Sequence, residues 1–190
     1  IQLALGDAAP AIREHALRLS ESRLGSSPKL LERAVALADD EALRVRFQAA
    51  FSLGASRDDR AVQALARLAI RDAKDEWLRT AVLSSITETA PHVLALWLAD
   101  EEFTKRPDGQ GMLAQAAYIV GARNRAEEIR DVLQALAAHR QSSKDRSIEQ
   151  QIVLGLGDGL RQMGHQLPVP STAGDASPAD VYLRGLLEET

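Results

Sequence analysis

Apolar residues recur at helical spacing along most of the chain, three or four positions apart. This spacing places apolar side chains on one face of a helix, and Gly, Pro or acidic residues interrupt the pattern between successive segments. The pattern predicts ten helices, with boundaries good to a few residues: 9–23, 28–38, 41–54, 59–71, 75–88, 91–99, 110–122, 124–139, 146–164 and 178–188.

Several of these helices carry start signals. Pro28, Pro91 and Pro178 fall in the first turn, where a missing backbone N–H costs nothing. Asp58 and Ser177 are suited to cap the helices that follow them, because their side-chain oxygens accept hydrogen bonds from free backbone N–H groups. We therefore expect helices to begin at or directly beside these positions.

Two stretches break the pattern and have the composition of loops, 100–110 and 167–177. We predict that the second loop ends a repeat stack formed by residues 1–166. Residues 178–190 would then form a last helix that caps the stack or begins a link to another domain, because a terminal repeat needs a cover for its apolar face.

One motif returns at a fixed period. Arg13, Arg46 and Arg79 are 33 residues apart, each directly after an apolar residue, and the segments ending at Gly54 and Gly121 match at two periods, 67 residues apart. Each period holds two amphipathic segments, so the repeating unit is a helical hairpin. The sequence therefore predicts an all-α fold, an α-solenoid of about five hairpins.

The charged residues of this period resemble those of the HEAT repeat, which has an acidic residue in the turn between its helices and a basic one in its second helix. Asp39 with Arg46, and Asp72 with Arg79, occupy these places. In that family such pairs form a ladder between neighbouring repeats. The resemblance therefore implies HEAT-like hairpins in which these four residues are structural.

A more specific resemblance comes from two longer strings, residues 75–85 and 153–160. They look like the helical-repeat segment of the large exported dehydrogenase-like proteins of planctomycetes and verrucomicrobia. In that family the repeats follow a β-propeller and precede a haem-binding cytochrome c module. The resemblance implies an exported or periplasmic parent protein whose redox chemistry lies outside this chain.

Composition supports the helical fold and narrows the partners. Apolar residues make up 45% of the 190 residues and aromatic residues only 4%, which suits close packing of helices. The 23 basic and 27 acidic residues are mixed along the chain, so no basic patch for nucleic acid is expected. No apolar run is long enough to span a bilayer. Because the first residue is Ile1, we expect a piece of a longer polypeptide.

The residue types that carry catalysis or bind metals are scarce or scattered. The chain has no cysteine, and none of its four histidines, His15, His92, His139 and His165, pairs with another ligand at metal-binding helical spacing. No acid–base pair is placed by the sequence. We therefore predict no catalytic residue, no metal and no cofactor.

Three glycines, Gly155, Gly157 and Gly159, fall inside one predicted helix. They lack the spacing and the flanking strands of a dinucleotide-binding loop. In a helix interior they would together cost about 2 to 3 kcal/mol relative to alanine. We therefore expect a compensating feature, either close packing of a neighbouring helix or a break in the helix.

The second helices of the period offer the best candidate surface. In helix 41–54 we place two apolar stripes inwards, which leaves Glu41, Arg44, Gln48 and Ser52 facing outwards. Trp97 lies in an apolar run and is expected in the core, whereas the sequence leaves the environment of Trp77 open. Carried across the period, the outward positions predict a concave binding row: His15, Arg44, Gln48, Trp77 and Gln115.

Three functions remain open at this point. The first is a non-catalytic scaffold that binds a protein or a neighbouring domain of the same polypeptide, since repeat stacks present extended surfaces. The second is a helical-repeat enzyme, such as a chromophore lyase or a DNA-repair glycosylase. The third is self-association through the open ends of the stack.

Overall fold

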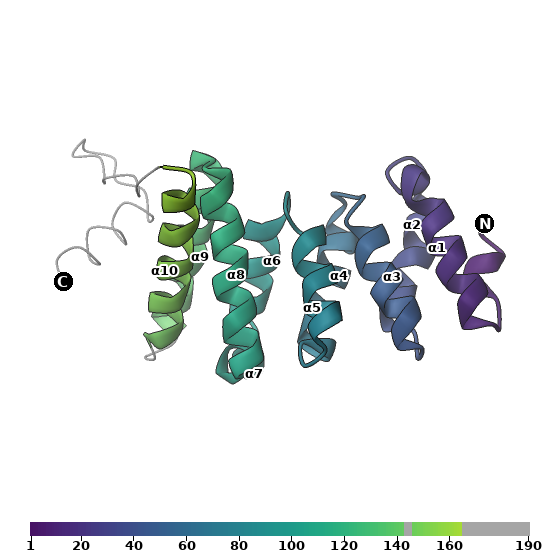
Figure 1. The fold of residues 1–190 in the computed structure, drawn as a ribbon, viewed down its shortest axis with the longest axis horizontal. Coiled ribbons are helices and arrows are strands. Elements are labelled where there is room, and N and C mark those ends of the chain that lie inside the picture. Colours follow the sequence, from purple (N-terminus) through teal and green to yellow (C-terminus); the bar gives the residue numbers. More distant parts are fainter. Residues whose placement is uncertain (143–145, 165–190) are drawn as a thin grey trace. The chain divides into compact units, whose positions relative to one another are not determined.

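A computed structural model describes residues 1–142 and 146–164 (Figure 1). The chain divides into two compact units, residues 1–89 and residues 90–190, which we describe one after the other. All regular elements in the described residues are helices. The predicted all-α fold of HEAT-like helical hairpins is confirmed.

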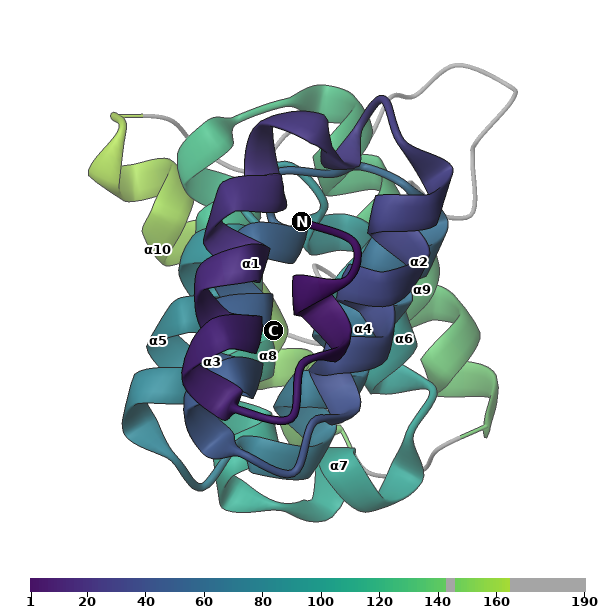
Figure 2. The same ribbon diagram turned by 90° about the vertical axis from the view of Figure 1, so that its right-hand side faces the viewer.

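The first unit consists of hairpins in two layers. Helices α1, α3 and α5 lie side by side in one layer, and α2 and α4 pack behind them (Figures 1 and 2). A short 3₁₀ helix, η1, precedes α1, and a second, η2, ends the first hairpin. The bounds are η1 Ala4–Gly6, α1 Pro10–Leu24, α2 Pro28–Ala36, η2 Leu37–Asp39, α3 Leu43–Leu53, α4 Asp59–Asp72 and α5 Glu76–Ser85.

Local sequence sets the starts of these helices. Pro10 and Pro28 occupy the first helical positions of α1 and α2. The side chain of Asp58 caps α4 by accepting a hydrogen bond from the Arg60 N–H at 3.0 Å, as predicted. Asp75 caps α5 by accepting a hydrogen bond from the Leu78 N–H at 2.9 Å. The predicted helix boundaries in this unit hold to within about three residues.

The second unit contains α6 (Ala90–Leu98), α7 (Glu101–Lys105), α8 (Pro107–Arg123), α9 (Ala126–Ser142) and α10 (Ser147–Gln162). Helix α6 packs on α8 and α9, and α8 packs along α10. Trp97 on α6 is fully buried, with its ring 5.6 Å from that of Phe103, so its predicted place in the core is confirmed.

The prediction of a loop at 100–110 is wrong. Asp100 caps α7 by accepting a hydrogen bond from the Phe103 N–H at 2.9 Å, and α8 begins at Pro107. Position 109 in α8 requires glycine, because any Cβ there would lie only 2.0 Å from the Phe103 carbonyl oxygen. This stretch has the composition of a loop, yet its Pro starts a helix and its Gly admits a neighbouring backbone.

The expected close approach of a helix to the glycines of α10 is confirmed at two of the three positions. A Cβ at Gly155 would lie 2.3 Å from the Ala114 carbonyl oxygen, and one at Gly159 would lie 2.2 Å from that of Tyr118. Both carbonyls belong to α8. Gly157 instead faces open space, so it takes no part in this contact.

Helix α8 contributes a glycine of its own. A Cβ at Gly121 would lie 2.2 Å from the Leu156 carbonyl oxygen of α10. The two helices are therefore in backbone contact along one side. The predicted loop at 167–177, the capping helix at 178–190 and the start signals Ser177 and Pro178 lie outside the described residues.

Candidate functional site

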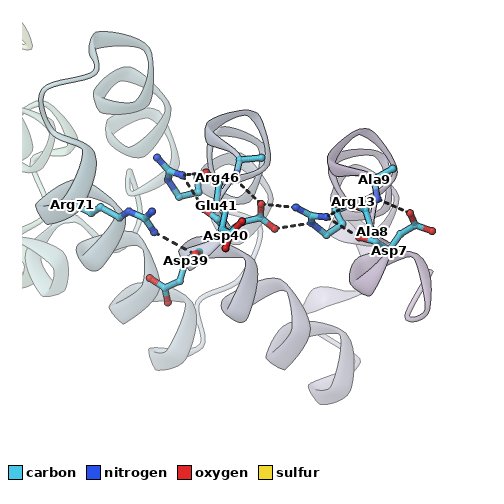
Figure 3. Close-up of polar contacts among 10 residues, drawn as sticks. Asp7, Ala8, Ala9, Arg13, Asp39, Asp40, Glu41, Arg46 and Arg71 are labelled. Atoms are coloured by element: carbon cyan, nitrogen blue, oxygen red, sulfur yellow. Dashed lines mark hydrogen bonds and ion pairs between the residues drawn. The ribbon is translucent and has the colours of Figure 1, made fainter.

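The recurring arginines of the first unit join neighbouring hairpins. The Arg13 guanidinium donates two hydrogen bonds, of 2.7 and 2.8 Å, to the Asp40 carboxylate at the start of the next hairpin (Figure 3). Arg46 donates two bonds, of 2.7 and 2.9 Å, to Asp72 one hairpin further. These paired bonds form the ladder that the resemblance implied, and we call each one a rung.

The partners in the ladder differ from the predicted pairs, because Asp72 bonds Arg46 rather than Arg79, and Arg46 bonds no Asp39. Asp40, and not Asp39, carries the first rung. Asp39 instead lies near the chain's second layer, where its carboxylate is 3.5 Å from Arg67 and its backbone carbonyl accepts a hydrogen bond from Arg71. The sequence cannot distinguish Asp39 from Asp40, because they lie seven and six residues before Arg46 and both fit the period.

Each arginine also secures the turn before its own helix. Nη1 of Arg13, Arg46 and Arg79 donates a hydrogen bond, of 2.7 to 2.8 Å, to the carbonyl six residues earlier. A backbone carbonyl at the end of a hairpin needs such a donor. The same position thus closes its own turn and, in the first two hairpins, reaches the next one, which explains the 33-residue period.

Two effects oppose each other at Asp40. Its burial acts to raise the carboxyl pKa, but the hydrogen bonds from Arg13 and from the Ala42 N–H stabilise the charged form. The net result is an Asp40 pKa below its usual value. This carboxylate is therefore ionised throughout the neutral range and holds its rung there.

The predicted outward positions of α3 are wrong for two of the four residues. Gln48 is only 6% exposed, and Ser52 is fully buried. The Gln48 side chain accepts a hydrogen bond from Arg18 and donates one to Glu21, both on α1, and the Ser52 hydroxyl donates a further bond to Glu21. This polar network lies between α1 and α3, so the Gln48 side of α3 faces α1.

One of the apolar stripes that we placed inwards lies outwards instead. Leu43 and Phe51 are exposed and Phe47 is half-buried, while Val45, Ala49 and Leu53 on the other stripe are fully buried. Phe47 and Phe51 pack edge to face, with ring centroids 5.0 Å apart. One period further, on α5, Trp77 occupies the place of Arg44 and is 75% exposed. We call these residues, all exposed except the half-buried Phe47, the outward strip: Leu43, Arg44, Phe47, Phe51 and Trp77.

The four predicted binding residues of the first unit therefore do not form one row, because Gln48 is buried. Arg44 and Trp77 share the outward strip, and Arg44 is paired with Glu14 of α1 at 2.6 Å. His15 is exposed on α1 at the position equivalent to the buried Gln48. Gln115 is exposed on α8, in the second unit. Their role in binding stays a prediction.

A shallow hollow of about 570 Å³ adjoins the strip where α3 and α5 end. Phe51 and Gly54 line it from α3, and Ser84 and Ser85 line it from α5. Across it, Arg57 and Glu88 form an ion pair. The combination of an aromatic edge, hydroxyl groups and a charged pair is suited to an extended peptide or a loop of another protein.

The described residues offer little for other kinds of chemistry. Within 1–142 and 146–164, no group of three His, Asp or Glu side chains could hold a metal ion. In the same residues no helix is long and apolar enough to cross a membrane. Ser84 donates its hydroxyl hydrogen to the Ala81 carbonyl at 2.9 Å, an ordinary bond within a helix.

The outward strip could have been found from the sequence. Leu43, Phe47 and Phe51 recur every four residues, as do Val45, Ala49 and Leu53, and both sets cannot face the core of a helix that also has neighbours on two sides. The signal that decides between them is the arginine of the ladder. Arg46 must face the adjacent hairpins, and this fixes the rotation of α3.

Residues 1–87 match the family described as HEAT repeats. No match was found to a curated protein or to a solved structure. The matched region coincides with the first unit, where the ladder lies. The match, the period and the helical hairpins together support a HEAT-repeat protein with an all-α fold.

Proposed function

We propose that this chain is a non-catalytic scaffold that binds a protein partner, or a neighbouring domain of its own polypeptide, through the outward strip of its first unit. The main support is the exposure of Trp77, whose side chain is 75% exposed. The neighbouring helix α3 directs Leu43, Phe47 and Phe51 to the same outward strip. Large exposed apolar and aromatic side chains on one face are typical of a binding surface.

The opposite layer of the same unit supports this choice of face. The exposed positions of α4 are charged or polar, among them Arg60, Gln63 and Arg67, whereas its apolar residues are buried except for the half-buried Ile70. A solvated surface has this composition. Among helices α1 to α5, the large exposed apolar side chains therefore lie in the layer of α1, α3 and α5, where a partner would cover them.

A peptide-display selection on the intact 190-residue chain tests the proposal. Selected peptides should lose at least tenfold in affinity for the Trp77→Ala and Phe51→Ser variants, because a central aromatic residue contributes about 2 kcal/mol or more to an interface. The Gln63→Ala variant on the other layer is the matched control and should bind unchanged. Peptides that bind all four proteins equally would refute the outward strip as a binding surface.

The HEAT match supports an interaction scaffold, while the finer context remains our proposal. We propose an exported parent protein with flanking β-propeller and cytochrome c modules, on the basis of the strings at 75–85 and 153–160. The parent gene provides the test. A haem-attachment motif after this segment and a propeller before it would support the context, and other flanking domains would exclude it.

A further inference from the structure

The outward strip has a charged border where α3 meets α1, and two arginines share one carboxylate there. Arg44 of α3 donates a hydrogen bond from Nε to the Glu14 carboxylate at 2.6 Å, and Nη2 of Arg18 lies 3.7 Å from the same group. The arginine side chains are 59% and 57% exposed, whereas that of Glu14 is 17% exposed. Two guanidinium groups thus face a single carboxylate at the edge of an apolar strip.

Arg44 keeps most of its hydrogen-bonding capacity. Of its guanidinium nitrogens only Nε is bonded within the described residues, so both Nη groups can donate to a further acceptor. Glu21, the next carboxylate of α1, is bonded to Gln48 and Ser52 and forms no ion pair among the described residues. A carboxylate suits an open guanidinium, because its two oxygens match two parallel N–H groups. This border of the strip therefore fits a carboxylate from another molecule.

The α5 side of the strip has the opposite hydrogen-bonding character. Thr80 and Ser84 are exposed there, one period after the two phenylalanines of α3. Each hydroxyl donates its hydrogen to a carbonyl of its own helix, at 3.0 Å for Thr80 and 2.9 Å for Ser84. Because the hydrogen is used in this way, each oxygen can only accept a further bond. The α5 side therefore fits N–H donors, such as those of a peptide backbone.

Charge gives the strip a direction. Glu76 is exposed on α5, directly before Trp77, so this side carries a negative charge. A carboxylate of a bound molecule would be repelled beside Glu76 and attracted beside Arg44. Between the two sides lie the aromatic residues Phe47 and Phe51, which offer only apolar contact. The strip therefore distinguishes the two ends of a molecule that crosses it.

The width of the layer sets the length of such a molecule. Helices α1, α3 and α5 lie side by side (Figure 1). Packed helices are about 8 to 10 Å apart, so the distance from α1 to α5 is about 16 to 20 Å. An extended peptide advances about 3.3 Å per residue, so about six residues cross the layer.

We infer that the outward strip binds an extended segment of a protein partner, with an acidic residue at the α1 end and apolar residues towards the α5 end. The inference rests on the function proposed above and adds the chemistry and the direction of the ligand. The acidic side chain would accept hydrogen bonds from the Nη groups of Arg44. Apolar side chains would cover Phe51 and Trp77, and backbone N–H groups would donate to Thr80 and Ser84.

Selection from a library of random peptides of about eight residues, displayed against the intact 190-residue chain, tests the ligand class. Selected peptides that bind Trp77→Ala more weakly should carry Asp or Glu towards one end and apolar residues beyond it. Replacing the acidic residue by its amide should weaken binding to the wild-type chain about fivefold, the effect of one charge pair at the border of an interface. The same replacement should change nothing in the Arg44→Gln variant, because the charge pair is already lost.

Two further variants separate the charge pair from a change in folding. Glu14→Gln should raise the affinity for the acidic peptides about threefold, because it removes the carboxylate that competes for Arg44. Arg67→Gln is the matched control: Arg67 is 48% exposed on α4, in the other layer, and its loss should leave binding unchanged. Circular dichroism should show the same helical content in all variants.

The two proposals fail in different ways. Selected peptides that depend on Trp77 but are basic or uncharged, or that bind Arg44→Gln as tightly as the wild type, would overturn the inferred ligand class and leave the strip as a binding surface. Peptides that bind Trp77→Ala unchanged would remove the strip itself, and both proposals with it. In sedimentation we expect a monomer, and a dimer that Arg44→Glu abolishes would assign the strip to a second copy and overturn the inference.

Discussion

Neighbouring helices of one layer are joined in two different ways in the two units. Between α1 and α3 the contact is made by side chains: an arginine rung and the network around Gln48. Between α8 and α10 the contact is made by backbone, because Gly155 and Gly159 bring carbonyl oxygens to where a Cβ would stand. The first joint depends on charge and hydrogen bonds, and the second depends on the absence of side chains.

The comparison shows what a repeat can and cannot vary. A rung tolerates change around it so long as both charges remain, and it loses strength when one is removed. A backbone contact is indifferent to charge, yet it fails when a single methyl group is added on the contact side. Substitutions that remove a charge should weaken only the rung, and substitutions that add a methyl group should weaken only the backbone contact.

The largest loss of stability is expected from disrupting the backbone contact between α8 and α10. The Gly155→Ala/Gly159→Ala variant should lose about 4 kcal/mol of unfolding free energy in the second unit, since each methyl group meets backbone atoms and overpacking costs about 2 kcal/mol per site. Urea unfolding gives the total, and hydrogen–deuterium exchange should place the loss in α8 and α10. Wild-type exchange in these helices would show that the backbones are further apart than described.

Removal of a rung should have the next largest effect, and in the other unit. Arg46→Ala should cost about 3 kcal/mol, because it leaves the Asp72 carboxylate without its partner. Arg79→Ala is the matched control: Arg79 bonds a turn carbonyl in the same way but has no described carboxylate, so about 1 kcal/mol is expected. Equal losses in the two variants would mean that the turn bond, and not the rung, carries the stability.

The pH dependence of the first rung follows from the lowered Asp40 pKa. A carboxyl group whose pKa is lower in the folded state stabilises the protein above its unfolded pKa of about 3.9, and this stability is lost as the pH falls below that value. Asp40→Asn should therefore cost about 2 kcal/mol at pH 7, and this cost should shrink as the pH falls below the unfolded pKa. Urea midpoints from pH 2 to 7 measure both.

A second group titrates in the same range and serves as the control for this experiment. Hydrogen bonds from the side chain and the backbone N–H of Arg60 lower the pKa of Asp58 to about 2. Asp58 makes no contact with the rung, so Asp40→Asn should have the same pH-dependent effect in an Asp58→Asn background as in the wild type. A difference that stays constant from pH 2 to 7 would contradict an ionised rung.

The smallest expected effect is a gain in the free energy of unfolding rather than a loss. Gly157 lies in the same helix as Gly155 and Gly159, but a Cβ there meets nothing within 4 Å. Gly157→Ala should therefore stabilise the second unit by up to about 1 kcal/mol, through helix propensity alone. A rise in the thermal midpoint checks this. A loss of stability would show that the open side of α10 is occupied.

The periodic features of the fold could be predicted from the sequence, because they depend on spacing within one helix or one period. The spacing of Arg13, Arg46 and Arg79 predicts the hairpins, and the glycines of α10 predict the close approach of a neighbouring helix. Helix α7 is not predicted from the sequence, because the Pro and Gly residues of 100–110 are typical of a loop, although Asp100 and the acidic first turn are helix-start signals.

The α3 part of the candidate surface follows from the ladder arginine, but the burial of Gln48 and the exposure of Trp77 depend on contacts between distant residues. Gln48 is buried by partners on α1 that lie 27 and 30 residues earlier, and no local spacing reveals that they meet. Once that polar side is buried, the stripe of Leu43, Phe47 and Phe51 has to face outwards. Trp77 could be named as a candidate, but its exposure could not be derived.

The chain has two tryptophans, and the structure gives them opposite surroundings. Trp97 is sealed within the second unit, while Trp77 stands in solvent on the first. Their fluorescence should therefore divide into a blue-shifted component that acrylamide quenches poorly and a red-shifted one that it quenches readily. Without any label, the protein therefore carries one optical reporter of folding in one unit and one of the proposed binding surface in the other.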